Sequence, residues 1–144
     1  MANYECVIRT NYFRVKDEER FRALMDVVSA GNLEFWEKKD ENGFPVFAFG
    51  SFGPVYGIPH LVEGGEYEAD EESYDEFLYQ LKDLVAEDEA VIIMEAGHEK
   101  LNYASGNATV VTCRTVEYVD LEKTALKLCR KLLHDPDYDP AMCY

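Results

Sequence analysis

The sequence predicts an α+β fold: a single domain with a mainly antiparallel sheet of about five strands and three helices, in the order β-α-β-β-α-β-β-α. Two runs rich in apolar and β-branched residues, 90–94 and 108–119, are separated by Gly, Asn and Ser residues, which is typical of a β-hairpin. Apolar residues at helical spacing elsewhere predict amphipathic helices on one side of the sheet. The 144 residues suit one domain, which we place at residues 1–135 with a tail at 136–144.

The first predicted strand spans residues 4–15, where apolar and aromatic side chains alternate. One face of this strand is expected to carry Cys6, Ile8 and Tyr12, and the other Val7 and Phe13. Asp17 then offers an N-cap for a helix whose apolar positions run from Phe21 to Val28 and which ends at Gly31.

A hairpin and a loop are predicted next. Residues 33–38 and 44–52 read as paired strands, because Asn42-Gly43 between them is typical of a tight hairpin turn. The segment 50–60 is rich in Gly, Pro and aromatic residues and is therefore expected to be an ordered loop. This loop either packs on the surface or presents Phe52, Tyr56 and His60 to a partner.

A second helix is predicted to begin at Ser73, because Ser73 and Glu76 match the capping-box pattern. Its expected buried face consists of Tyr74, Phe77, Leu78, Leu81, Leu84 and Val85. The strand at 90–94 is apolar at each position, so we expect both of its faces to be covered.

The last predicted helix follows Asp120, which offers an N-cap, and ends at His134 or Asp135 because Pro136 disfavours helix before it. Its expected inward face consists of Leu121, Ala125, Leu128, Cys129 and Leu132. Its outer face is basic, a local exception in an acidic chain, and carries Lys123, Lys127, Arg130 and Lys131.

The charge balance narrows the partners that this chain can have. Acidic residues number 29 and basic residues 14, which gives a net charge of −15. Such a charge repels duplex nucleic acid and anionic lipid, so we expect no direct nucleic-acid binding and no membrane binding. The four cysteines form no CxxC pair and no signal peptide is visible, so we expect reduced thiols in a cytoplasmic protein.

Eight acidic residues cluster between residues 63 and 76, and no Lys or Arg interrupts them. The cluster consists of Glu63, Glu66, Glu68, Asp70, Glu71, Glu72, Asp75 and Glu76, with Tyr67 and Tyr74 interleaved. A run of like charge is usually a solvated surface. The alternative is a binding surface in which the carboxylates meet a basic protein and the two tyrosines anchor it.

The sharpest candidate for catalysis is the stretch Glu95-Ala96-Gly97-His98-Glu99. A histidine beside carboxylates at the end of a strand can act as a general base or bind a metal. The pattern is not HExxH, however, and His60 and His134 lie far away in the sequence. His98, Glu95, Glu99 and His60 are therefore weak catalytic candidates, and the sequence predicts no cofactor and no metal site.

Two stretches carry a resemblance to known proteins. They are Asn11–Asp17 (NYFRVKD) and Glu87–Thr112, whose core reads EDEAVIIMEAGHEKLNYASG. In them the chain resembles small acidic proteins of unknown function carried by conjugative elements and phages of Gram-positive gut bacteria. The resemblance transfers no site residues. It implies an accessory gene of mobile DNA, a setting that includes antagonists of host defence, some of which are acidic DNA mimics.

Three hypotheses about function follow. The first is a binding protein whose acidic cluster docks on a basic host or mobile-element protein, for example in its nucleic-acid groove. The second is a small hydrolase-like or metal-dependent enzyme with a pocket under the loop 53–60 that uses His98 with Glu95 or Glu99. The third is a homo-oligomer in which the basic face of the last helix meets the acidic cluster of another copy.

Overall fold

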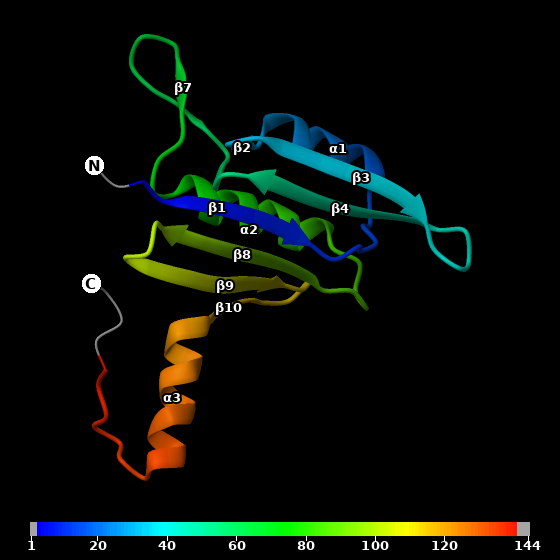
Figure 1. Ribbon diagram of the computed structural model, residues 1–144. Helices are drawn as coiled ribbons and strands as arrows, with labels where there is room; N and C mark the ends of the chain where they lie inside the picture. Colours follow the sequence, from blue (N-terminus) through cyan, green and yellow to red (C-terminus); the bar gives the residue numbers. More distant parts are fainter. Residues whose placement is uncertain (1–2, 141–144) are drawn as a thin grey trace.

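The computed structural model describes residues 3–140, which form three helices and a main antiparallel sheet of six strands in the order β10-β9-β8-β1-β4-β3 (Figure 1). The predicted α+β class is confirmed. The strands of this sheet are β1 (Glu5–Thr10), β3 (Leu33–Lys39), β4 (Pro45–Phe52), β8 (Val91–Glu99), β9 (Tyr103–Val111) and β10 (Val116–Asp120). Two small sheets pair β2 (Ser29–Ala30) with β5 (Val55–Gly57), and β6 (His60–Leu61) with β7 (Tyr67–Glu68).

The sixth strand arises because the apolar run 108–119 is broken by a turn. The Thr112 hydroxyl oxygen accepts hydrogen bonds from the backbone N–H groups of Arg114 (3.2 Å) and Thr115 (3.0 Å). This side chain closes the turn between β9 and β10, as threonine does in many tight turns. Gly97 and Gly106, in contrast, lie inside β8 and β9 rather than at their connection.

Helices α1 (Glu18–Val27) and α2 (Ser73–Leu84) cover one face of the sheet (Figure 1). As predicted, Asp17 caps α1, because its carboxylate accepts from the Arg20 N–H at 3.1 Å. Five fully buried phenylalanines fill the space between helices and sheet, with ring centroids 4.9 to 6.4 Å apart in neighbouring pairs: Phe13, Phe21, Phe47, Phe49 and Phe77. Aromatic burial on this scale dominates the stability of a small domain.

The strand predicted at 4–15 is shorter than expected, and its two faces do not alternate to the end. β1 stops at Thr10, and the chain bends after it. As a result Phe13 lies in the core, while Tyr12 lies on the opposite side of the sheet, where its ring centroid is 4.2 Å from the Lys38 Nζ atom. The predicted placement of Tyr12 and Phe13 is therefore wrong. The reason is local: the Asn11 side chain takes over hydrogen bonds that a continuing strand would make.

The capping box predicted for α2 is also wrong, although the helix begins where it was expected. The Ser73 hydroxyl oxygen accepts from the Asp70 N–H (2.8 Å) and thus closes the preceding turn instead of capping the helix. Glu72 occupies the cap position, and its side chain makes no cap hydrogen bond.

Helix α3 (Leu121–Leu133) is capped by Asp120 as predicted, but it does not pack as predicted. In the part of the chain that the structure describes, none of its residues is buried. Leu121, Ala125, Leu128, Cys129 and Leu132 are all exposed, so their predicted inward orientation is wrong. Figure 1 shows the reason: α3 leaves the β10 edge and extends away from the sheet.

Two glycines test how tightly α2 is held against β5. A Cβ atom at Gly57 (φ +108°) would lie 2.0 Å from the Ser73 carbonyl oxygen, whereas one at Gly43 (φ +83°) would meet nothing within 4 Å. We expect Gly43→Ala to lower the free energy of unfolding by about 1 kcal/mol, from backbone strain alone. Gly57→Ala adds a backbone clash and should cost about 3 kcal/mol or more. Urea unfolding measures both, and equal losses would contradict the close contact.

Candidate functional site

The catalytic candidates do not converge on one point. Successive residues of a strand point to opposite faces, so His98 in β8 faces away from Glu95 and Glu99. The His98 Nε2 atom lies 3.6 Å from a Glu5 carboxylate oxygen on β1. His60 lies on β6, where its Nε2 atom is 3.5 Å from an Asp70 carboxylate oxygen. The structure therefore does not bring the four predicted residues together.

Glu95 is engaged on the helix-covered side of the sheet. Its carboxylate accepts a hydrogen bond from the Tyr4 hydroxyl at 2.8 Å, and the same hydroxyl lies 3.2 Å from the Ser105 hydroxyl. Burial, together with the negative charge of Glu95, raises the pKa of Tyr4 to about 12. Because the phenol stays protonated at neutral pH, it acts here as a hydrogen-bond donor and not as a base.

A hollow of about 420 Å³ lies beside His98, lined by Tyr4, Glu5, Cys6, Val7, Phe52, Gly53, Ala96 and His98. Cys6 is the nucleophilic side chain in this lining. Burial, and then the charge of Glu95, raise the pKa of its thiol, so the reactive thiolate is disfavoured. Among residues 3–140, no three His, Cys, Asp or Glu side chains are arranged to hold a metal ion.

The acidic cluster lies on a hairpin that stands out from the body of the domain and on the first turn of α2 (Figure 1). Gly64 and Gly65, both at positive φ, make the turn at its tip. We call the following eight residues, all of them exposed, the acidic hairpin surface: Glu63, Glu66, Glu68, Asp70, Glu71, Glu72, Asp75 and Glu76.

The carboxylates of the acidic hairpin surface have no lysine or arginine partner within residues 3–140. Their sole ion-pair contact in that range is the one between Asp70 and His60. Three arginines elsewhere on the molecule pair with other carboxylates: Arg14 with Asp88 and Glu89, Arg20 with Asp83, and Arg22 with Glu37. The negative charge of the hairpin is therefore not neutralised by the fold itself.

The aromatic residues predicted to accompany these charges differ in their exposure. Tyr67 is 69% exposed on β7, at the centre of the acidic hairpin surface. Tyr74 packs against the core, and its hydroxyl lies 3.0 Å from the Thr109 hydroxyl, so its ring is already used within the fold. Phe52 and Tyr56 are exposed, Phe52 beside the hollow at His98 and Tyr56 on β5.

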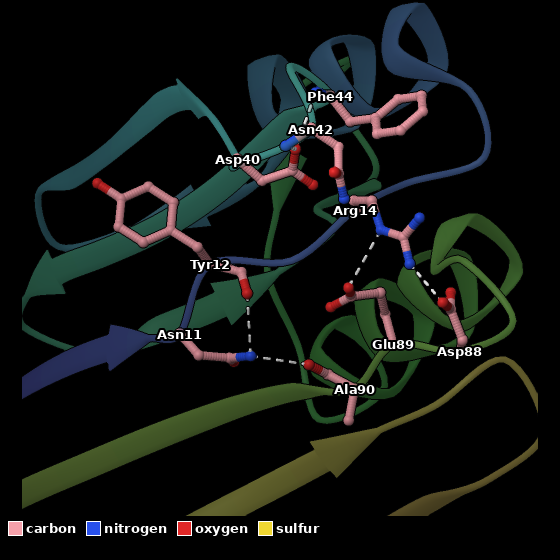
Figure 2. Close-up of polar contacts among 9 residues, drawn as sticks. All are labelled: Asn11, Tyr12, Arg14, Asp40, Asn42, Phe44, Asp88, Glu89 and Ala90. Atoms are coloured by element: carbon pink, nitrogen blue, oxygen red, sulfur yellow. Dashed lines mark hydrogen bonds and ion pairs between the residues drawn. The ribbon is translucent and has the colours of Figure 1, made fainter.

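The stretches Asn11–Asp17 and Glu87–Thr112 meet in space (Figure 2). The Asn11 amide donates to the Ala90 carbonyl (2.9 Å), and its oxygen accepts from the Ile92 N–H (2.8 Å). Arg14 pairs with Asp88 and with Glu89, the latter at 3.2 Å (Figure 2). These contacts fasten the bend after β1 to the start of β8, so these residues form a structural junction. The sequence signal that could have revealed this junction is Asn11, an asparagine directly after a strand.

One surface was missed by sequence reasoning. The face of the sheet opposite α1 and α2 carries an apolar groove of about 520 Å³, which Val7, Met94, Ala96 and Ala108 line together with Leu121. We expected both faces of the strand at 90–94 to be covered, but Ile92 and Met94 are exposed. That expectation is wrong, because within residues 3–140 no helix lies over this part of the sheet.

Comparison of the chain with protein-family models, with curated proteins and with solved structures found no match. In the part of the chain that the structure describes, no helix has both the length and the apolar character that crossing a membrane requires.

The raised pKa of Tyr4 predicts a loss of stability at high pH. A phenol whose pKa is about 12 in the folded state and about 10 when unfolded stabilises the fold fully below pH 10, and this contribution is lost as the pH rises toward 12. Tyr4→Phe removes the titrating group. We therefore expect this variant to have a lower melting temperature than wild type at pH 7, because Glu95 loses its donor. Above pH 10 the difference in melting temperature between variant and wild type should become smaller.

Thermal melts between pH 7 and pH 12 measure this effect, with Tyr67→Phe at an exposed position as the matched control. A gap between wild type and Tyr4→Phe that stays constant across this range would show that Tyr4 is not held protonated by its surroundings.

Proposed function

We propose that this chain is a protein-binding domain that captures a basic protein through the acidic hairpin surface. The observation that carries the proposal is the lack of any lysine or arginine partner, within residues 3–140, for eight clustered carboxylates on a projecting hairpin. Carboxylates that the fold leaves unneutralised produce a strong local negative potential, which speeds association with a positive surface and selects partners by charge.

The exposed ring of Tyr67 gives this surface an anchor. Aromatic side chains that fill a partner's pocket commonly supply most of the binding energy, while surrounding charges set orientation and rate. A row of carboxylates flanking a ring is chemically closest to a strand of phosphates beside its bases. A protein that itself binds nucleic acid is therefore the partner class that this surface suits best.

In biological terms, we propose an accessory protein of a mobile element that antagonises a host protein, for example by occupying its nucleic-acid groove. The supports are the family resemblance and the overall charge of −15. The enzymatic alternative near His98 has weaker support, because Glu95 and Glu99 face away from His98 and the Cys6 thiol is held protonated.

Charge reversal tests the proposal. We expect Glu71→Lys combined with Glu72→Lys to weaken partner capture roughly tenfold or more, because two central carboxylates become repulsive. The matched control is Glu41→Lys combined with Glu87→Lys, which makes the same change in net charge at exposed positions outside the acidic hairpin surface. Immobilised wild type and variants would be compared for the proteins that they retain from a bacterial lysate, and for affinity toward the purified partner.

Two further measurements sharpen the test. Raising the salt concentration should weaken capture, and duplex DNA should compete with the chain for its partner if the carboxylates occupy a nucleic-acid groove. Capture that is indifferent to salt, or that both double variants weaken equally, would rule out the acidic hairpin surface as the binding site.

A further inference from the structure

The bare apolar face of the sheet has defined limits. Register places Val7, Met94, Ala96, Gly106 and Ala108 on the face opposite α1 and α2. Of these side chains, Val7 is 49% and Met94 60% exposed. The small residues between them make a flat floor, which allows a helix to approach closely. A contiguous apolar patch of this kind, left open, marks an interaction site.

The other half of the same face is already covered. The ring of Trp36 packs over Gly50, and the Arg9 guanidinium stacks on Trp36 at 4.3 Å from its centroid. Tyr12 and Lys38 extend this stack. The uncovered zone is therefore confined to β1, β8, β9 and β10, and its edge is the strand from which α3 departs.

Helix α3 also exposes an apolar surface. It carries an apolar stripe at helical spacing, in which Leu128 is 54% and Leu132 68% exposed, opposite a basic side. An isolated helix of fewer than about 12 to 15 residues is marginal in water, so a helix of 13 residues needs packing to persist. In the described part of the chain, α3 contacts the strands β9 and β10, and Leu121 in its first turn lies over Gly106.

We infer that α3 lies on the open sheet face of a second copy of this chain, and that the second copy returns the same contact. The first argument is continuity. Leu121 and Thr124 already form one wall of the apolar groove on this face. A helix arriving from another copy would extend that wall across Ala96 and Ala108, with its leucines over the flat floor.

The second argument is size. A 13-residue helix is about 20 Å long. The four uncovered strands span about 15 Å across the sheet, and the nine-residue strands β8 and β9 are about 30 Å long. One α3 therefore fits on the bare zone.

The third argument is charge, which favours another copy over an unrelated apolar partner. Four of the 14 basic residues lie on α3, which has a single acidic residue, Glu122. The uncovered zone carries carboxylates at its rim: Glu5 on β1 and Glu117 on β10. The basic side of α3 can meet these groups while its leucines cover the apolar floor.

The connection explains why the contact is between copies. Asp120 ends β10 and also caps α3, so no linker allows α3 to fold back over its own sheet. Figure 1 shows α3 directed away from the β10 edge. Reciprocal exchange of the two helices closes a two-fold dimer and buries both apolar surfaces at once.

Single-surface variants test the exchange. We expect wild type to be a dimer in sedimentation equilibrium, and both the double variant Leu128→Glu/Leu132→Glu and the variant Met94→Glu to raise the dimer dissociation constant roughly 100-fold. The matched control is Leu101→Glu, which places the same charge on a leucine that is 96% exposed at the β8–β9 turn and should leave the dimer intact. Circular dichroism melts confirm that each variant folds.

Mixing separates this dimer from other assemblies. The α3 double variant retains an intact sheet face and Met94→Glu retains an intact α3, so an equimolar mixture should form a mixed dimer through one restored contact. A wild type that stays monomeric at about 100 μM overturns the inference, since that corresponds to a free energy of association weaker than about 5.5 kcal/mol. A dimer that Met94→Glu leaves unchanged would also overturn it, because the two α3 helices would then pair with each other instead of with the sheet. A monomer whose α3 binds anionic phospholipid vesicles would overturn it as well.

Discussion

The architecture depends on one constraint: a six-stranded sheet has two faces, and two packed helices cover one of them. The phenylalanine core between helices and sheet explains why that face is the covered one. Phe47 and Phe49 point from β4 into the same layer that Phe21 of α1 and Phe77 of α2 enter. Burial of such rings is the largest single stabilising contribution in a domain of this size. On the opposite face, the part formed by β1, β8, β9 and β10 is left with small side chains and a few exposed apolar ones.

The same constraint places the acidic hairpin surface. The β6–β7 hairpin lies in the connection between β4 and α2, and its base is held because the Ile58 N–H donates to the Ser73 carbonyl (2.9 Å). A rigid base with a projecting tip presents charged side chains without burying them, which is how many binding loops are positioned. Because the tip lies outside the packed layers, the fold does not require its carboxylates to be neutralised.

Predictions from short sequence patterns were correct where a side chain determines the structure of its immediate neighbours in the chain. Asp17 and Asp120 cap their helices, and the predicted hairpin turns at Asn42-Gly43, where the Asp40 carboxylate also accepts from the Asn42 and Phe44 N–H groups, because each outcome depends on atoms within a few residues. The alternation along residues 4–15 failed at Asn11, where a side chain replaces backbone pairing. For α3, the periodicity correctly identified an apolar stripe. A sequence pattern states that a face is apolar, however, and not which surface covers it or to which molecule that surface belongs.

The two proposed surfaces depend on different physical forces, and this makes them separable. Two copies that each carry a net charge of −15 repel one another overall, although the basic side of α3 attracts the rim carboxylates locally. The dimer must therefore be held mainly by apolar burial, and salt should change it far less than it changes capture of a basic partner. Capture of a basic partner depends on attraction across the acidic hairpin surface, which the same salt weakens. A dimer also presents two such hairpins on one particle. A partner with two basic sites would then bind the second hairpin at a high effective concentration, so loss of the α3 exchange would reduce capture of that partner without altering a single carboxylate.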